Sequence, residues 1–149
     1  MKSVLLTVLF LSVSLISCRE TAPVLLPSTS EQLALSMQPN RTPGGDPLPR
    51  VRISAGSGSV TMVVTQRWMC GGRVTAGMNR APGDLAIVVR QILPDSILAC
   101  TLMIPVLDYT GTITGLSAGS YRVRVFEAQS NTRSRLLGSA TVSVSTPAT

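Results

Sequence analysis

The chain has 149 residues, of which 44% are hydrophobic and 13% charged, and its formal net charge is +6. This length accommodates one domain with a tail, and the high hydrophobicity argues against a disordered chain. The sequence has no histidine, and Lys2 is its only lysine. We therefore expect no histidine general base, no imidazole metal ligand and no Schiff-base chemistry, and the composition favours a non-enzymatic protein.

Residues 1–17 begin with Met1 and a single basic residue, Lys2. The rest of this segment is uncharged and mostly apolar. One basic residue and a short uncharged apolar run are typical of a secretory signal peptide. A membrane-spanning helix needs roughly 20 apolar residues, and Arg19-Glu20 end this run too early. We therefore expect residues 1–17 to direct export and then to be removed.

The apolar segment ends in Leu15-Ile16-Ser17-Cys18. This block resembles the lipobox of bacterial lipoproteins, and an ordinary cleaved signal peptide is the alternative. The resemblance implies that cleavage leaves Cys18 as the first mature residue, and that acyl chains on it anchor the protein in a membrane. In a Gram-negative cell, Arg19 after the cysteine is not the family's usual signal for inner-membrane retention, which is typically an aspartate, and this favours the outer membrane.

Residues 18–49 are expected to form the lipidated N-terminus and a proline-rich linker. Six prolines lie between Arg19 and Pro49, and this density disfavours long helices and strand ladders. One interruption is expected, because Thr29-Ser30-Glu31-Gln32 fits a capping box. It predicts a short helical turn over residues 33–37 that ends before Pro39.

From residue 50 to residue 146 the pattern has period two and is broken by turn residues, which predicts an all-β domain. Gly71-Gly72 and Pro82-Gly83 mark two of the turns, and Gln66 interrupts an apolar face and suggests a bulge. We expect seven strands, at Val51–Ile53, Val60–Cys70, Asp84–Gln91, Ser96–Ile104, Thr110–Thr114, Tyr121–Ala128 and Leu136–Val144. Seven short antiparallel strands are the usual content of an immunoglobulin-like β-sandwich.

The stretch from Tyr109 to Val125 reads YTGTITGLSAGSYRVRV. It resembles the penultimate hairpin of bacterial immunoglobulin-like and fibronectin-III-like modules: a strand, Gly-Leu, a glycine turn, a tyrosine and alternating valines. The resemblance implies that the Tyr121 hydroxyl bonds to backbone before the turn while its ring packs into the core. Val123 stands where an antibody-type domain has its second core cysteine. The resemblance concerns the fold and carries no function.

Cys70 and Cys100 remain as an even pair once Cys18 is acylated, and both fall on the inward parity of their strands. In an oxidising compartment this predicts a disulfide between them, worth roughly 3–4 kcal/mol by the chain-entropy argument. The alternative is a periplasmic copper or redox carrier. It would use Cys70 with soft methionine ligands drawn from Met62, Met69, Met78 and Met103.

Two apparent enzyme features do not support catalysis. Gly115-Leu116-Ser117-Ala118-Gly119 matches the G-x-S-x-G nucleophile elbow. No histidine can serve as its base, and a β-alternating run follows it instead of a helix. Asp84, Asp95 and Asp108 are scattered and are expected to make turns.

A candidate partner-binding face consists of Arg90, Arg122, Arg124 and Phe126, which share the outward parity of two strands. If the third and sixth strands are neighbours, these residues lie on one side of one sheet, together with Ala86 and Val88. Arginine and aromatic residues are enriched at interfaces, although a plain solvated face is the alternative. The expected partners are the membrane through the acyl chains and an envelope protein or an anionic glycan. Nucleic acid is not expected as a partner, because the chain is exported and has no aromatic platform among its basic residues. We expect no metal and no cofactor.

Overall fold

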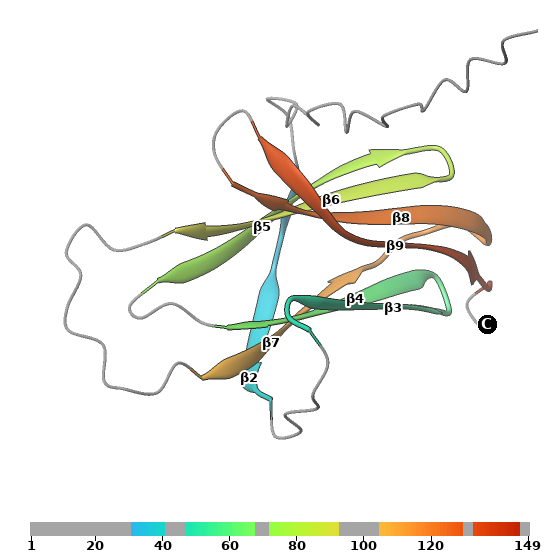
Figure 1. Cartoon of the computed structure of the whole chain (residues 1–149). Helices are drawn as coiled ribbons and strands as arrows, with labels where there is room; N and C mark the ends of the chain where they lie inside the picture. Colours follow the sequence, from blue (N-terminus) through green and yellow to red (C-terminus); the bar gives the residue numbers. More distant parts are fainter. Residues whose placement is uncertain (1–30, 41–46, 68–71, 93–104, 130–132, 147–149) are drawn as a thin grey trace, which may run out of the picture.

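The computed structural model describes residues 31–40, 47–67, 72–92, 105–129 and 133–146. Within these ranges the chain forms nine strands and no helix. The strands form two sheets that pack against each other (Figure 1). The all-β sandwich expected from the alternating pattern is therefore confirmed.

The first sheet has five strands in the order β1-β5-β6-β8-β9. Neighbouring strands are antiparallel except for β6 and β8, which run parallel. The strands are β1 (Glu31–Leu33), β5 (Arg73–Ala81), β6 (Asp84–Ile92), β8 (Gly119–Ala128) and β9 (Ser134–Val144).

The second sheet has four strands in the order β2-β7-β4-β3, and all of its pairings are antiparallel. Its strands are β2 (Leu35–Pro39), β7 (Val106–Ile113), β4 (Ser59–Arg67) and β3 (Arg50–Gly56). The β3–β4 and β4–β7 ladders are continuous and show no bulge at Gln66.

A single stretch of chain joins the two sheets along one side of the sandwich. β1 pairs with β5 in the first sheet, and after Ala34 the chain continues as β2, which pairs with β7 in the second sheet. Leu33 and Leu35 approach Gly111 of β7 so closely that a Cβ at this glycine would lie 2.8 Å from one and 3.0 Å from the other. Because Gly111 has no side chain, the chain has room beside β7 to pass from the first sheet to the second.

On the other side of the sandwich, the edge strands β3 and β9 lie against each other. A Cβ at Gly138 of β9 would lie 3.0 Å from the Cβ of Val51 in β3. Ser57 and Ser145 form an isolated parallel bridge just beyond the two strands. Both sides of the sandwich are thus closed, which reduces the length of unpaired strand edge.

The core lies between the sheets and consists of the residues with inward parity. Its centre is apolar and fully buried, as the alternation of β4, β6 and β8 predicts. The buried residues are Leu33, Val60, Met62, Val64, Ala76, Met78, Leu85, Ile87, Val89, Ile113, Leu116, Val123, Val125 and Val144.

The two ends of the sandwich differ. The connections β3–β4, β5–β6 and β7–β8 meet at one end, which we call the turn end (Figure 1). The Leu116 amide donates to the Gly58 carbonyl at 3.1 Å, and the Arg122 amide donates to the Gly83 carbonyl at 2.8 Å. The first bond links the β7–β8 connection to the β3–β4 turn, and the second ties the β5–β6 turn to strand β8. The β3–β4 and β5–β6 connections are two-residue turns, and each has a glycine at positive φ, Gly58 at 59° and Gly83 at 69°.

Several expectations about the strands were wrong. There are nine strands in the described ranges instead of seven, and the pairing of β6 with β8 is parallel, unlike the expected antiparallel arrangement. The helical turn over residues 33–37 does not form, because Leu33 and Leu35 are buried or half-buried at strand spacing and not at helical spacing. Residues 31–39, which were assigned to the linker, thus belong to the sheets, and β5 was missed. The strand expected at Ser96–Ile104 lies outside the described residues.

Candidate functional site

The face predicted to bind a partner lies on the outside of the five-stranded sheet. β6 and β8 are neighbours, and the register sets Asp84 beside Arg122 and Ala86 beside Arg124. Because paired residues share one side of a sheet, both arginines lie on the side opposite the buried core. Arg90 of β6 has the same parity. These side chains share one face as their parity predicts, because β6 and β8 are neighbours.

Arg124 is held in place on this face. Its Nη2 lies 2.6 Å from Oδ2 of Asp84, and its guanidinium carbon lies 5.8 Å from the centroid of the Phe126 ring. The ion pair fixes the direction of the guanidinium, and the ring offers it a cation–π contact. Both charged side chains are about one-third exposed, at 31% and 32%. The parallel pairing of β6 with β8 aligns these strands and creates the Asp84 contact, which sequence reasoning missed.

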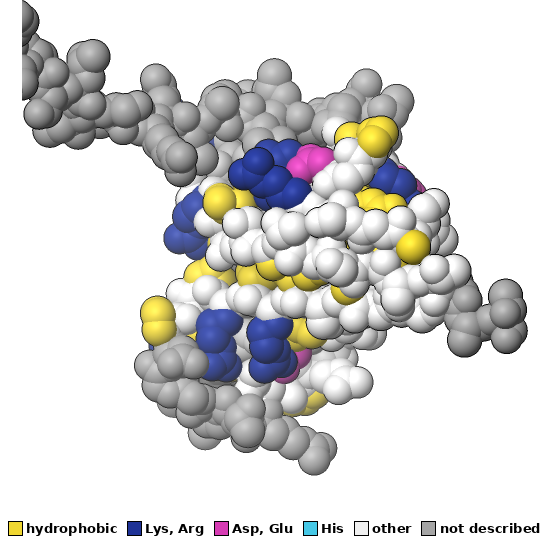
Figure 2. Space-filling model, turned by 90° about the vertical axis from the view of Figure 1, so that its right-hand side faces the viewer, with side chains coloured by type: hydrophobic (Ala, Val, Ile, Leu, Met, Phe, Trp, Pro, Cys, Tyr) yellow, Lys and Arg dark blue, Asp and Glu magenta, His cyan; other side chains and the backbone are white. Residues whose placement is uncertain are grey.

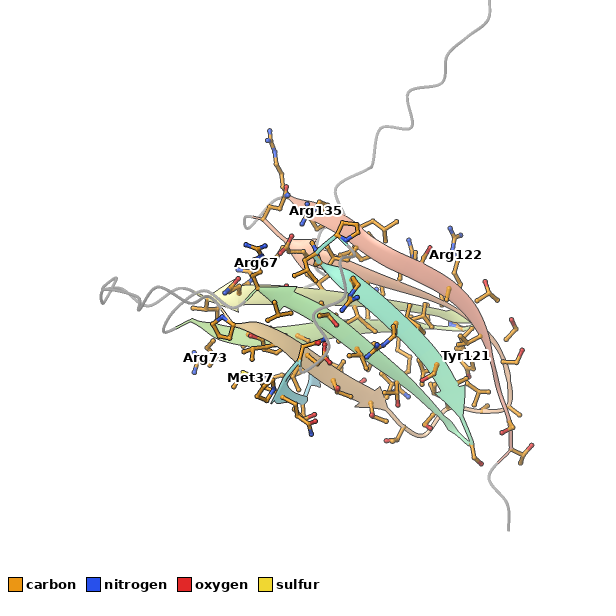
Figure 3. All side chains as sticks on the ribbon, turned by 60° about the horizontal axis from the view of Figure 1, so that its bottom comes forward. Met37, Arg67, Arg73, Tyr121, Arg122 and Arg135 are labelled. Carbon is orange, nitrogen blue, oxygen red and sulfur yellow. The ribbon has the colours of Figure 1, made fainter. Side chains whose placement is uncertain are left out.

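The four predicted residues differ in accessibility. Phe126 is only 4% exposed and belongs to a small apolar cluster with Ala86 and Val88. Arg90 and Arg124 are half-buried, whereas Arg122 is exposed and points away from the sheet (Figure 3). Phe126 is therefore not an exposed anchor. The exposed apolar residue next to it is Leu136, which pairs with Phe126 across β8 and β9 and is 43% exposed.

A second polar cluster surrounds Asp108 on the outside of the four-stranded sheet. Its Oδ1 accepts hydrogen bonds from the Thr65 hydroxyl and, at 3.0 Å, from Nδ2 of Asn40. Nη2 of Arg52 lies 4.0 Å from its Oδ2. Burial opposes ionisation of Asp108, but these two hydrogen bonds and the positive charges of Arg52 and Arg50 outweigh it and lower its pKa below the usual 3.8. The cluster ties the end of β2 to the middle of β7, so the turn-making role predicted for Asp108 was wrong.

The turn end carries an open cleft between the β5–β6 turn and the β7–β8 connection. It encloses about 310 Å³ and is lined by Arg80, Ala81, Pro82, Gly115, Leu116, Ser117 and Tyr121. The Tyr121 hydroxyl donates to the backbone carbonyl of Ser117 at 3.1 Å, and its ring packs against the core. This confirms the expected tyrosine contact. The segment 115–119 leads directly into strand β8, as expected for a turn.

The cysteines and methionines that were predicted to form a disulfide or a copper site fall into two groups. Cys18, Cys70 and Cys100 lie outside the described residues, and so do the predicted ligands Met69 and Met103. Met62 and Met78 are 0% and 2% exposed and fill the apolar core, where methionine packs as an adaptable apolar side chain. In the part of the chain that the structure describes, no three His, Cys, Asp or Glu side chains are grouped to hold a metal ion. No helix there is long and apolar enough to span a membrane.

Charge on the described surface is unevenly balanced. Each carboxylate side chain in the described ranges faces an arginine: Glu31 faces Arg80, Asp84 faces Arg124, Asp108 faces Arg52, and Glu127 faces Arg135. Arg67, Arg73 and Arg122 are exposed, and none of them forms an ion pair with these carboxylates. Figure 2 shows the basic side chains in several separate groups on the face that it displays. The surface therefore attracts anions without concentrating all of its charge at one point.

Comparisons with protein-family models, with curated proteins and with solved structures find no match to this chain.

Proposed function

We propose that this protein is a lipid-anchored cell-envelope protein that presents one β-sandwich module for non-catalytic binding. The N-terminal segment with Cys18 at its end supports the anchor. The closed sandwich supports a rigid module that displays surface side chains. The surplus of exposed arginines supports an anionic partner, and an anionic envelope glycan is the partner class that we favour.

We further propose that the module is a variant of the immunoglobulin-like sandwich. The bond from Tyr121 to the Ser117 carbonyl supports this relationship, because such a tyrosine contact before a strand is a hallmark of these folds. The parallel pairing of β6 with β8 is the feature in which the variant departs from the usual arrangement.

The anchor would hold the module close to the membrane. Twelve residues, 19–30, separate Cys18 from the first residue of β1. At about 3.1 Å per residue in an extended conformation, they reach at most ~40 Å. The strands β1 and β2 shorten the linker, so the module would work near the lipid headgroups and not far above them.

The outer face of the five-stranded sheet is our proposed docking surface. The observation that carries it is the fixed pair of Arg124 and Asp84 beside the exposed Arg122. A guanidinium that is oriented before binding loses little freedom when an anion arrives. Leu136 adds exposed apolar surface at the edge of the same face.

A comparison of two charge reversals tests this surface. Arg122→Glu and Arg135→Glu change the net charge by the same amount, but Arg135 lies at the start of β9, where it faces Glu127 at 2.7 Å. The full-length protein in detergent would be titrated onto immobilised polygalacturonate, with neutral dextran as the control surface. We expect Arg122→Glu to weaken binding by about fivefold or more and Arg135→Glu to have a smaller effect. Equal losses in the two variants would contradict a specific face.

Intact-mass spectrometry of the membrane-extracted protein tests the anchor. We expect a chain that starts at Cys18 and carries the added mass of acyl chains, and a Cys18→Ser variant that has none. The same measurement reports whether Cys70 and Cys100 have lost two hydrogens to a disulfide. An unprocessed chain with its leader attached would contradict the anchor.

A further inference from the structure

The turn end of the sandwich carries an open cleft, and nothing in the proposed docking function requires it. We propose that it binds a small carboxylate that carries a flat apolar group, such as an aryl carboxylate. Figure 3 shows Tyr121 at this end of the molecule, well away from Arg67 and Arg73 at the opposite end. The site is therefore separate from the basic residues at the far end of the sandwich.

The size and the walls of the cleft fit a small, partly apolar ligand. Its volume of about 310 Å³ lies at the lower end of the roughly 300–1,000 Å³ found for ligand pockets. Ala81, Pro82 and Leu116 contribute apolar side chains to the lining, and Tyr121 contributes an aromatic one. The bond to the Ser117 carbonyl holds one edge of the Tyr121 ring while core packing holds the other. A flat apolar group can therefore stack on a ring that is already in position.

The charge of the lining selects an anion. Arg80 is the one charged residue among the residues that line the cleft. Its Nη1 donates to the Thr114 carbonyl at 3.3 Å, and its Nη2 lies 3.6 Å from Oε2 of Glu31. A guanidinium has five N–H donors in a planar fork that matches a carboxylate. These two long contacts leave Arg80 able to bind a second carboxylate at short range.

Glu31 acts as an internal competitor for this position. Its side chain is 59% exposed and faces Arg80 from the first residue of β1, and it is not among the cleft-lining residues. A ligand carboxylate that takes over the Nη2 donor of Arg80 must displace Glu31. The geometry therefore makes a signed prediction: removing the Glu31 charge should strengthen ligand binding, whereas removing the Arg80 charge should weaken it.

Titration of the full-length protein in detergent micelles with sodium benzoate, followed by NMR, tests the proposal. The reporters are the backbone amides of Ala81, Gly115 and Ser117, which line the cleft. We expect saturable shifts with a dissociation constant on the order of 1 mM. Benzamide, which has the same ring without the charge, should shift these amides much less at equal concentration.

Three variants complete the test. Glu31→Gln should bind benzoate about two- to fivefold more tightly, in keeping with the strength of an exposed ion pair. Arg80→Gln should bind it at least about fivefold more weakly. Arg73→Gln is the matched control, because it removes an exposed arginine at the opposite end of the sandwich, and it should bind as the parent does.

Three results would overturn the proposal. The first is equal shifts with benzamide and benzoate, because the site would then not select the charge. The second is unchanged or weaker benzoate binding in Glu31→Gln, a variant that keeps every lining residue. The third is a loss in Arg73→Gln as large as that in Arg80→Gln, which would assign the effect to net charge. The first two results do not depend on whether Arg80→Gln folds. The third does, and the amide spectrum of Arg80→Gln reports directly whether that variant is folded.

Discussion

The approach of β1 and β2 to Gly111 makes this glycine a sensitive point of the fold. Gly111 pairs with Met62 on one side and with Leu35 on the other. A Cβ added there would lie 2.8 Å from Cδ2 and 3.2 Å from Cγ of Leu33, and 3.0 Å from Cδ2 of Leu35. Real Cβ atoms do not come within 3.0 Å of another heavy atom, so the Gly111→Ala variant must move Leu33, which is 7% exposed.

The expected loss of stability follows from two opposing effects. Overpacking a well-filled core costs typically ~1–3 kcal/mol. The φ of Gly111 is not in the positive region, so alanine also removes freedom from the unfolded chain, which stabilises by about 0.4–1 kcal/mol. We therefore expect Gly111→Ala to lower the free energy of unfolding by about 0.5–2 kcal/mol, as measured by equilibrium urea denaturation.

Two further variants check that the clash is the cause. Gly56→Ala is the control, because a Cβ there meets only the Ser59 hydroxyl, at 2.9 Å, at the end of a mobile side chain. It should change stability by less than about 0.5 kcal/mol. Leu33→Ala should cost less in the Gly111→Ala background than alone, since it makes room for the added methyl. Strictly additive losses, or a Gly111→Ala protein as stable as the parent, would refute the steric argument.

Three other changes test the packing and the hydrogen bonds. Tyr121→Phe removes the bond to the Ser117 carbonyl and should lower the free energy of unfolding by about 0.5–1.5 kcal/mol in urea denaturation, and an unchanged value would show that the bond contributes nothing. Thr65→Val removes a hydrogen bond that lowers the pKa of Asp108, so an NMR pH titration should find that pKa raised. Because the folded pKa of Asp108 is depressed, its contribution to stability is present above the unfolded pKa of 3.8 and is lost as the pH falls through the folded value. The variant should therefore lose less stability than the parent on acidification below about pH 4, and equal losses would contradict this. Met62→Ala empties a fully buried position and should cost about 2–5 kcal/mol by thermal or urea unfolding, whereas a loss below 1 kcal/mol would place Met62 outside the packed core.

The sequence predicts the central strands well because their alternation is local. Val60, Met62 and Val64 recur at every second position, and all three are 0% exposed. The same signal was present in two elements that the sequence analysis missed. Leu33 and Leu35 are spaced as in a strand, but the prolines and the capping-box pattern nearby favoured a linker with a helical turn. Tertiary pairing with β5 and β7 decides in favour of strands there.

The candidate sites depend on contacts between distant parts of the chain, and local patterns do not encode these contacts. The parity of Arg122 and Arg124 could be derived from β8 alone. The partner of Arg124 is Asp84, and it depends on the parallel register of β6 with β8. The Asp108 network likewise joins Asn40, just after β2, and Thr65 of β4, which are far apart in the sequence. A single sequence shows which residue types are available, but the register shows which of them meet.

The strands β1 and β2 move the expected boundary between the linker and the sandwich. Leu33 is buried in the core, and the strands on either side of Ala34 pair with one sheet each. Without residues 31–39, both β5 and β7 would expose unpaired edges, and the core would lose one of its buried leucines. Residues 31–39 therefore belong to the sandwich, where the sequence pattern placed a linker. Glu31 also faces Arg80 beside the cleft, so the first residue of β1 is the one that we propose to compete with a ligand for the charged side chain of the cleft.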